Sequence, residues 1–293
     1  MASRKDPLRT AIHVGVYVAL YFVVVIFSSG LFNWLLGYFG GVTATGFVSA
    51  LFANWLCLRI YEDRQLPDAG LWWNRASVDN LGIGFLGGVA SASLVLAPAL
   101  FFGFAHLTHT PGETFSAATL LYVAFLLAAG AAGEELFFRG YGFQVMLASA
   151  GTWATILPVG ILFALLHGAN PNVNWFGIAN TAGFGILFGY AYLRSRDLWL
   201  PLGLHFGWNF TLPLFGTNLS GLKMNVTGYV MSWSAGPLWS GGEYGPEASI
   251  LTSLVLPLLC VYVWKAPIRR QTSPIVDPPA ETVPCEPSLP SPS

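Results

Sequence analysis

The sequence predicts an all-α membrane protein, a polytopic bundle of about eight transmembrane helices. Of the 293 residues, 54% are hydrophobic and only 9% are charged, whereas about 25% are charged in soluble domains. The mean hydropathy is +0.59. The apolar residues form continuous runs, whereas a membrane β-barrel would show short alternating segments. A formal net charge of −1 gives no basic surface for a nucleic-acid partner.

Eight apolar runs approach the ~20 residues that a helix needs to cross the hydrocarbon core. They lie at 11–28, 42–60, 81–104, 116–135, 153–167, 173–193, 198–215 and 249–264. The first run follows three basic residues and precedes no convincing cleavage site, so we interpret it as a retained signal anchor. The sequence therefore predicts a short tail at 1–10 and a membrane-embedded domain at 11–265.

Lys and Arg alternate between the two sides of this predicted bundle. They occur in the tail at 1–10, between the second and third runs, between the sixth and seventh, and directly after the eighth. Arg139 lies between the fourth and fifth runs, and the remaining loops contain only Lys223. Short cytoplasmic loops carry the excess of basic residues, so both termini are predicted to be cytoplasmic, in what we expect to be a prokaryotic inner membrane.

Two regions fall outside the predicted spans. Residues 216–248 are rich in Gly, Ser and Trp and are predicted to form an outer loop on the membrane surface. Residues 266–293 are rich in Pro and Ser and are predicted to be disordered. The three cysteines show neither a disulfide framework nor zinc-binding spacing. Cys285 lies too far from the end to form a prenylation signal.

The first polar stretch is Gly133-Glu-Glu-Leu-Phe-Phe-Arg-Gly140. Ionisable side chains inside an apolar segment are costly, which makes them functional candidates. Glu135 and Arg139 are four residues apart, so a helix places them on one face as an ion pair. Glu134 points about 100° away from that face. The structural alternative is an ordinary salt bridge at the membrane surface.

The second and third polar stretches contain histidines. His167 ends a run of about 15 residues, which spans only about 22 Å as a helix. Its outer end therefore stops inside the bilayer, where irregular backbone must line a cavity. His205 and Asn209 are four residues apart on one face of a later run. A helix cap at His167 and an interhelical hydrogen bond at His205 are the structural alternatives.

The predicted topology contains one conflict. Glu134 lies near the cytoplasmic end of its run and His167 lies at the outward end of the next. The two side chains can meet only if the run ending at His167 is displaced inward, or if the run carrying Glu134 begins deeper in the membrane.

Together, Glu134-Glu135-x-x-x-Arg139, Phe163-x-x-x-His167 and His205-x-x-x-Asn209 resemble the motifs of the CAAX protease and bacteriocin-processing (CPBP/Abi) family of intramembrane endopeptidases. The resemblance covers about residues 60–215 and includes the upstream Glu62-Asp-Arg segment. It implies hydrolysis of peptide bonds in membrane-associated substrates, including prenylated CAAX-type tails, within the lipid bilayer.

The resemblance also implies roles for the site residues. Glu134 would be the general base, and His167 would help to hold the water. His205 and Asn209 would donate to the oxyanion, while Glu135 and Arg139 would organise the site. Burial and preorganised donors suit these roles. If a metal takes part, Glu134, His167 and His205 would supply the three ligands of an open zinc site. We favour a mechanism that requires no cofactor.

Two other classes of function stay open from the sequence. One is a proton-coupled transporter that uses the carboxylates and histidines as a relay. The other is a non-catalytic immunity or assembly protein that retains the fold. A relay would place carboxylates at several depths, whereas this sequence concentrates them in one motif, which favours the peptidase. The sequence predicts no particular oligomeric state.

Overall fold

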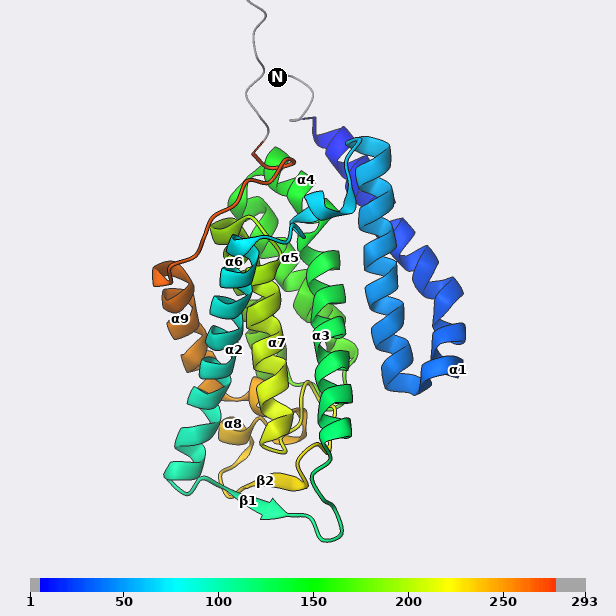
Figure 1. The fold of residues 1–293 in the computed structure, drawn as a ribbon. Helices are drawn as coiled ribbons and strands as arrows, with labels where there is room; N and C mark the ends of the chain where they lie inside the picture. The colour runs from blue at the N-terminus through cyan, green and yellow to red at the C-terminus, as the bar shows by residue number, and fades with distance from the viewer. Residues whose placement is uncertain (1–5, 278–293) are drawn as a thin grey trace, which may run out of the picture.

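The computed structural model describes residues 6–277, which form an elongated bundle of helices (Figure 1). Within these residues, five helical segments are long and apolar enough to cross a membrane: Pro7–Tyr61, Arg75–Phe101, Ala117–Ala150, Thr152–Ala169 and Trp175–Ser195. Large apolar side chains such as Phe27 and Phe101 point outward and are more than 80% exposed, as a lipid-facing surface requires. The predicted class, a helical membrane bundle, is confirmed.

Helix α1 (Pro7–Tyr61) contains the first two predicted spans as two arms. The arms meet at Gly37, whose φ of 71° and ψ of 176° interrupt the helix. A positive φ is readily adopted by glycine and strains other residues. At its start, the Asp6 carboxylate accepts a hydrogen bond from the Leu8 amide at 3.0 Å, which caps the helix. The sequence predicted a separate loop between these spans, and the structure replaces it with this bend.

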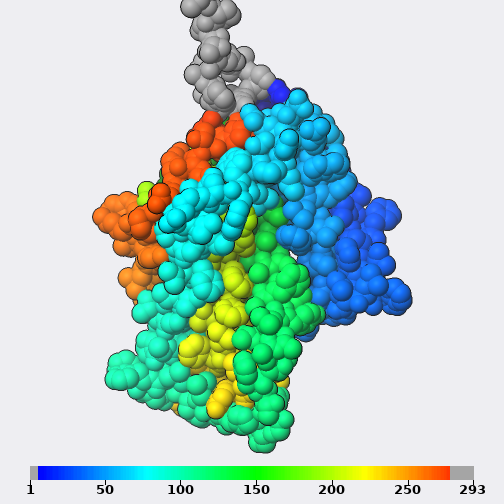
Figure 2. Space-filling model, in the orientation of Figure 1, coloured from blue at the N-terminus to red at the C-terminus, as the bar shows by residue number. Residues whose placement is uncertain are grey.

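Helices α2 (Arg75–Phe101) and α7 (Trp199–Leu214) are the most closely packed pair of helices in the described part of the bundle. Gly84 and Gly88 of α2 face Gly203 and Gly207 of α7, and a Cβ at any of the four would overlap backbone atoms of the opposite helix. Small residues allow such close approach between membrane helices. In the space-filling view, α2, α7 and α3 lie side by side on one face (Figure 2). This glycine contact fixes the position of α7.

Replacing Gly88 with Val is expected to force α2 and α7 apart, because the new side chain meets the carbonyl oxygen of Leu204 and the amide of Trp208. Overpacking of a tight core typically costs about 1–3 kcal/mol. The thermal unfolding midpoint of the purified variant should fall. The matched control is Gly82→Val on the same helix, because a Cβ at Gly82 meets nothing within 4 Å. Equal midpoints for the two variants would contradict the packing described here.

Helix α3 (Ala117–Arg139) is followed by the ten-residue helix α4 (Tyr141–Ala150), α5 (Thr152–Leu166), the 3-10 turn η2 (His167–Ala169) and α6 (Trp175–Ser195). The predicted runs at 116–135 and 153–167 left 136–152 outside any span, and most of this stretch is helix α4. Helix α5 has 15 residues, about 22 Å at 1.5 Å per residue. Together with η2 it forms the 18-residue segment Thr152–Ala169 named above, which is shorter than the ~20 residues of a usual span.

The end of the bundle opposite the described chain ends is covered by loops and short elements (Figure 1). Strand β1 (Ala105–His109) pairs antiparallel with β2 (Tyr229–Trp233), with Ala105 opposite Trp233. The short helix α8 (Pro237–Ser240) and the turns η3 (Gly242–Tyr244) and η4 (Pro246–Ala248) lead into α9 (Ile250–Lys265). The prediction of a surface loop at 216–248 is therefore wrong in part, since Glu247 is only 7% exposed.

Residues 266–277 pack against the helix ends, which differs from the disorder predicted for 266–293. The Gln271 side chain donates to Asp197 Oδ2 at 2.6 Å and accepts from Asn74 Nδ2 at 2.8 Å. Ser273 and Ile275 are buried. The composition suggested disorder because it contains little apolar surface, but here the polar side chains find partners at the ends of α2 and α6. The rest of that prediction, 278–293, lies outside the described residues.

Both described chain ends lie at the same end of the bundle (Figure 1). The start of α1 and the segment that follows α9 meet there. The position of the two termini relative to the membrane stays a prediction, and so does their cytoplasmic location.

Candidate active site

The first polar motif occupies the last two turns of α3, and α1 holds these turns in place. The Tyr17 hydroxyl donates to the carbonyls of Leu136 and Phe137 at 2.8 and 3.0 Å. Asn54 donates to the Leu136 carbonyl at 3.0 Å and accepts from the Tyr141 amide at 2.7 Å. The last carbonyls of a helix lack partners within it, so these contacts complete the C-terminus of α3 and fix its direction.

Glu135 and Arg139 form a buried ion pair. The two side chains are 1% and 0% exposed, and Arg139 Nη1 lies 3.2 Å from Glu135 Oε1. Arg139 Nη2 also donates to the Gly185 carbonyl at 2.7 Å. Three aromatic rings surround the guanidinium, with centroids 5.1–5.6 Å from its carbon, and belong to Phe138, Phe163 and Phe188. The pair predicted from the four-residue spacing is present, and it lies in the interior rather than at a surface.

His205 joins this pair from α7. Its Nδ1 lies 2.9 Å from Glu135 Oε1, so one carboxylate oxygen contacts both Arg139 and His205. The imidazole ring stacks on Phe188 with centroids 4.9 Å apart and an interplanar angle of 17°. A carboxylate at Nδ1 requires a proton on that nitrogen, which fixes the ring and directs Nε2 away from Glu135.

His167 approaches from the end of α5. Its Nδ1 lies 2.8 Å from the Phe163 carbonyl one turn earlier, and a carbonyl oxygen can only accept, so Nδ1 is the donor. The other nitrogen, Nε2, lies 3.8 Å from Glu134 Oε2. The conflict in the predicted topology is thereby resolved. Because α4 precedes α5 and α5 is short, His167 ends inside the bundle beside Glu134.

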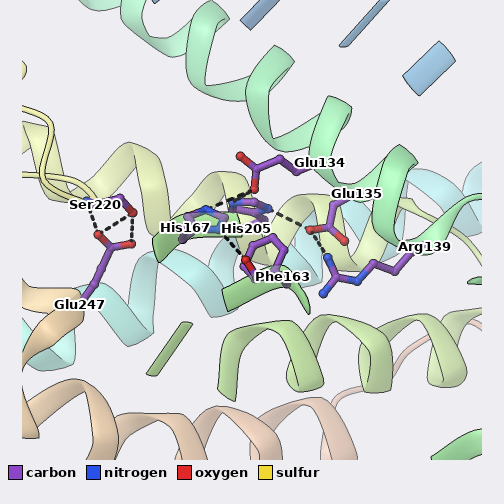
Figure 3. A network of polar contacts seen from close by, with 8 residues as sticks. All are labelled: Glu134, Glu135, Arg139, Phe163, His167, His205, Ser220 and Glu247. Carbon is purple, nitrogen blue, oxygen red and sulfur yellow. Dashed lines mark hydrogen bonds and ion pairs between the residues drawn. The ribbon is translucent and has the colours of Figure 1, made fainter. Parts of the chain in front are cut away.

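Glu134 is the carboxylate on which the two histidines converge (Figure 3). Its Oε2 lies 3.8 Å from Nε2 of His205, the same separation as from His167. The side chain is 39% exposed, yet Oε2 itself is buried and accepts no hydrogen bond from residues 6–277. A buried polar atom without a partner is unusual and calls for an explanation. Here it faces two imidazole nitrogens across a gap too long for direct hydrogen bonds.

Asn209 completes the predicted set. It follows His205 by four residues on α7 and lines the same cavity as Glu134, His167 and His205. Its side chain takes part in none of the hydrogen bonds found in the described part of the chain. Five of the six predicted residues are therefore connected by contacts of 3.8 Å or less, and the sixth shares their cavity.

The cavity has a volume of about 720 Å³, within the usual range for ligand pockets. Its polar end is formed by Glu134, His167 and His205, and the rest is mainly apolar. Aromatic side chains from both arms of α1 and from α3 line that part, including Tyr21, Phe22, Tyr38, Phe39 and Tyr122. The cavity therefore combines this polar centre with a mainly apolar lining.

The sequence analysis missed Glu247 and Ser220, which also line the cavity. Glu247 accepts hydrogen bonds from the Ser220 amide and from its hydroxyl, the latter at 3.0 and 3.1 Å (Figure 3). Burial raises the pKa of Glu247, while the hydrogen bonds from Ser220 and the nearby His167 oppose that rise. The available signal was a carboxylate two residues before the apolar run at 249–264. Such a signal is weak without the fold.

No group of three or more His, Cys, Asp or Glu side chains within residues 6–277 is arranged to hold a metal ion. The predicted zinc ligands Glu134, His167 and His205 do converge, with Glu134 Oε2 3.8 Å from Nε2 of each histidine. His205 Nδ1 contacts Glu135, which leaves Nε2 of His205 directed toward Glu134. Dependence on zinc stays a question for experiment.

Fold and site define a class: a polytopic helical membrane protein with a carboxylate–histidine centre enclosed between α3, α5 and α7. Residues 115–211 match the profile of the family described as Rce1-like, the type II CAAX prenyl endopeptidases. This segment contains all three polar motifs, and the match confirms the predicted resemblance. The uncharacterized protein YyaK of Bacillus subtilis (strain 168) is 26% identical over 200 residues, which cover 63% of this chain and 64% of YyaK.

Proposed function

We propose that this protein is an intramembrane endopeptidase that uses Glu134 to activate water against a peptide bond of a membrane-associated substrate. The observation that carries the proposal is the unpaired Oε2 of Glu134, which faces Nε2 of both His167 and His205 at 3.8 Å. A water molecule that donates one hydrogen bond to this oxygen and the other to Nε2 of His167 would be held for deprotonation. Glu134 is the obvious general base because it is the partly exposed carboxylate at the polar end of the cavity.

In this mechanism Glu134 takes one proton from the water, and the remaining hydroxide attacks the carbonyl carbon of the substrate. The carbonyl oxygen becomes negative and needs preorganised donors. Asn209 Nδ2 can donate to it. His205 can donate through Nε2 only as an imidazolium, because Nδ1 already donates to Glu135. When the C–N bond breaks, Glu134 returns its proton to the leaving amine, so that the site is restored.

Glu135 and Arg139 have an indirect role in this proposal. The negative charge of Glu135 stabilises the imidazolium form of His205, and Arg139 holds Glu135 in place through the 3.2 Å ion pair. The apolar compartment next to the polar centre suits a substrate with a lipid chain. The Rce1-like match over 115–211 supports prenylated tails as the substrate class.

The experiment is cleavage of a fluorogenic prenylated peptide by purified protein, with and without a strong chelator, followed by added zinc. We expect cleavage that is insensitive to the chelator. Loss of activity with chelator and recovery with zinc would contradict the metal-free mechanism and make Glu134, His167 and His205 ligands. Absence of cleavage, combined with proton-coupled uptake in vesicles, would favour the transporter.

A further inference from the structure

One side of the cavity is formed by a segment outside the family match, residues 219–225, which we call the roof segment. It contributes Leu219, Ser220, Leu222, Lys223, Met224 and Asn225 to the cavity lining. None of the roles assigned above to the three polar motifs involves this segment. Because it faces the same cavity as Glu134, it is placed to contact a bound substrate.

The roof segment is held by contacts along its length. Ser220 is bound through its amide and hydroxyl by the buried Glu247. The Gly221 amide donates to the Tyr244 carbonyl at 2.8 Å. Asn225 Nδ2 donates to Glu113 Oε1 at 2.9 Å. These contacts hold both ends of the segment, on either side of Lys223.

The anchor at Glu247 is itself rigidly supported by α6. Asn180 Nδ2 donates to the carbonyls of Glu247 and Ser249 at 2.8 and 2.9 Å. Asn180 Oδ1 in turn accepts from Ser253 Oγ at 2.7 Å. The roof segment is thus connected, through Glu247, to the helices that surround the site.

Lys223 is the one Lys or Arg among the described residues that line the cavity. None of the ion pairs found within residues 6–277 involves it. The carboxylates that share the cavity do not pair with it, because Glu247 is bound by Ser220 and Glu134 faces the histidines. An unpaired ammonium at the lining of a substrate cavity is suited to an anionic group of the ligand.

We propose that Lys223 binds the free C-terminal carboxylate of the substrate peptide. This proposal rests on the proposed peptidase function. Cleavage within a short tail leaves a leaving peptide that ends in a carboxylate. Lys223 and Glu134 line the same cavity, so one bound peptide can present its scissile bond to Glu134 and its carboxylate to Lys223.

The test compares two prenylated peptides that differ only in ending as a free acid or as an amide. We expect wild-type protein to cleave the acid with a kcat/KM at least about tenfold higher, as for a hydrogen-bonded charged pair. Lys223→Gln should lower kcat/KM for the acid to the value for the amide, and kcat/KM for the amide should stay unchanged. Lys223→Arg should retain most of the preference. The matched control is Lys265→Gln at the end of α9, which does not line the cavity and should behave like wild type.

Equal cleavage of acid and amide by wild-type protein would overturn the proposal, as would an intact preference in Lys223→Gln. The proteins are measured in nanodiscs. If Lys223→Gln lowers activity equally for both peptides, and if this loss depends on the anionic lipid content of the nanodiscs, Lys223 binds a lipid headgroup instead. Binding of both peptides to the Glu134→Gln protein provides the same comparison without turnover. If the protein is not a peptidase, the result differs: neither peptide is cleaved, whereas binding that prefers the acid to the amide persists.

Discussion

Glu134→Gln is expected to lower kcat by about 10³-fold, because the amide cannot accept a proton from water and general-base catalysis typically contributes 10²–10⁴-fold. The substitution keeps the size of the side chain. Glu134 is partly exposed and has no direct hydrogen-bond partner at Oε2 among the described residues, so the thermal unfolding midpoint should stay close to that of wild type. Steady-state cleavage of the prenylated peptide and a thermal scan on the same preparation measure both quantities.

The control for this substitution is Glu243→Gln, which changes an exposed carboxylate outside the cavity. Its activity should equal that of wild type. His205→Ala is expected to resemble Glu134→Gln in activity, because it removes an oxyanion donor. If Glu134→Gln kept more than a tenth of wild-type kcat, Glu134 would not be the base.

Arg139→Met is expected to have the largest effect on stability. The guanidinium is fully buried, and its loss leaves the Glu135 carboxylate without its cation. Breaking one side of a buried ion pair costs about 3–5 kcal/mol. We therefore expect a strongly lowered unfolding midpoint and a low yield of folded protein, measured by size-exclusion chromatography and thermal unfolding in detergent.

The paired substitution Glu135→Gln with Arg139→Met separates charge from packing. Replacing both members of a buried ion pair is often neutral or stabilising, so the double variant should recover more than half of the lost stability. Gln at 135 can still accept from His205 Nδ1, yet it cannot stabilise the imidazolium, so activity should stay low. A double variant less stable than Arg139→Met would contradict this description of the pair.

Spacing along the sequence predicted which site residues share a helix face, because each such pair lies on a single helix. The four-residue separations of Glu135 from Arg139 and of His205 from Asn209 determine shared faces regardless of the rest of the fold. The bend at Gly37 and the helix at 141–150 were missed. The bend depends on the backbone conformation of one residue. The helix depends on the packing of a segment whose ends carry only weak sequence signals. Helix α4 in turn decides where α5 ends, and therefore whether His167 reaches Glu134.

Long-range polar contacts could not be predicted. Glu247 and Ser220 lie 27 residues apart, and nothing in their neighbourhood in the sequence indicates that one binds the other. The segment 266–277 looked too polar to fold, yet Gln271 and Ser273 find partners on helices far away in the chain. In a membrane protein, such polar side chains are ordered by whichever unpaired groups the helix ends present to them.

The most direct test of the central claim is mass spectrometry of the products formed in H₂¹⁸O by wild-type and Glu134→Gln protein. The claim is that Glu134 activates water to hydrolyse a peptide bond inside this bundle. It predicts that wild-type protein yields a product with one ¹⁸O atom in its new carboxylate, and that Glu134→Gln yields almost none of this product in the same time. Equal amounts of labelled product from the two proteins would contradict the claim.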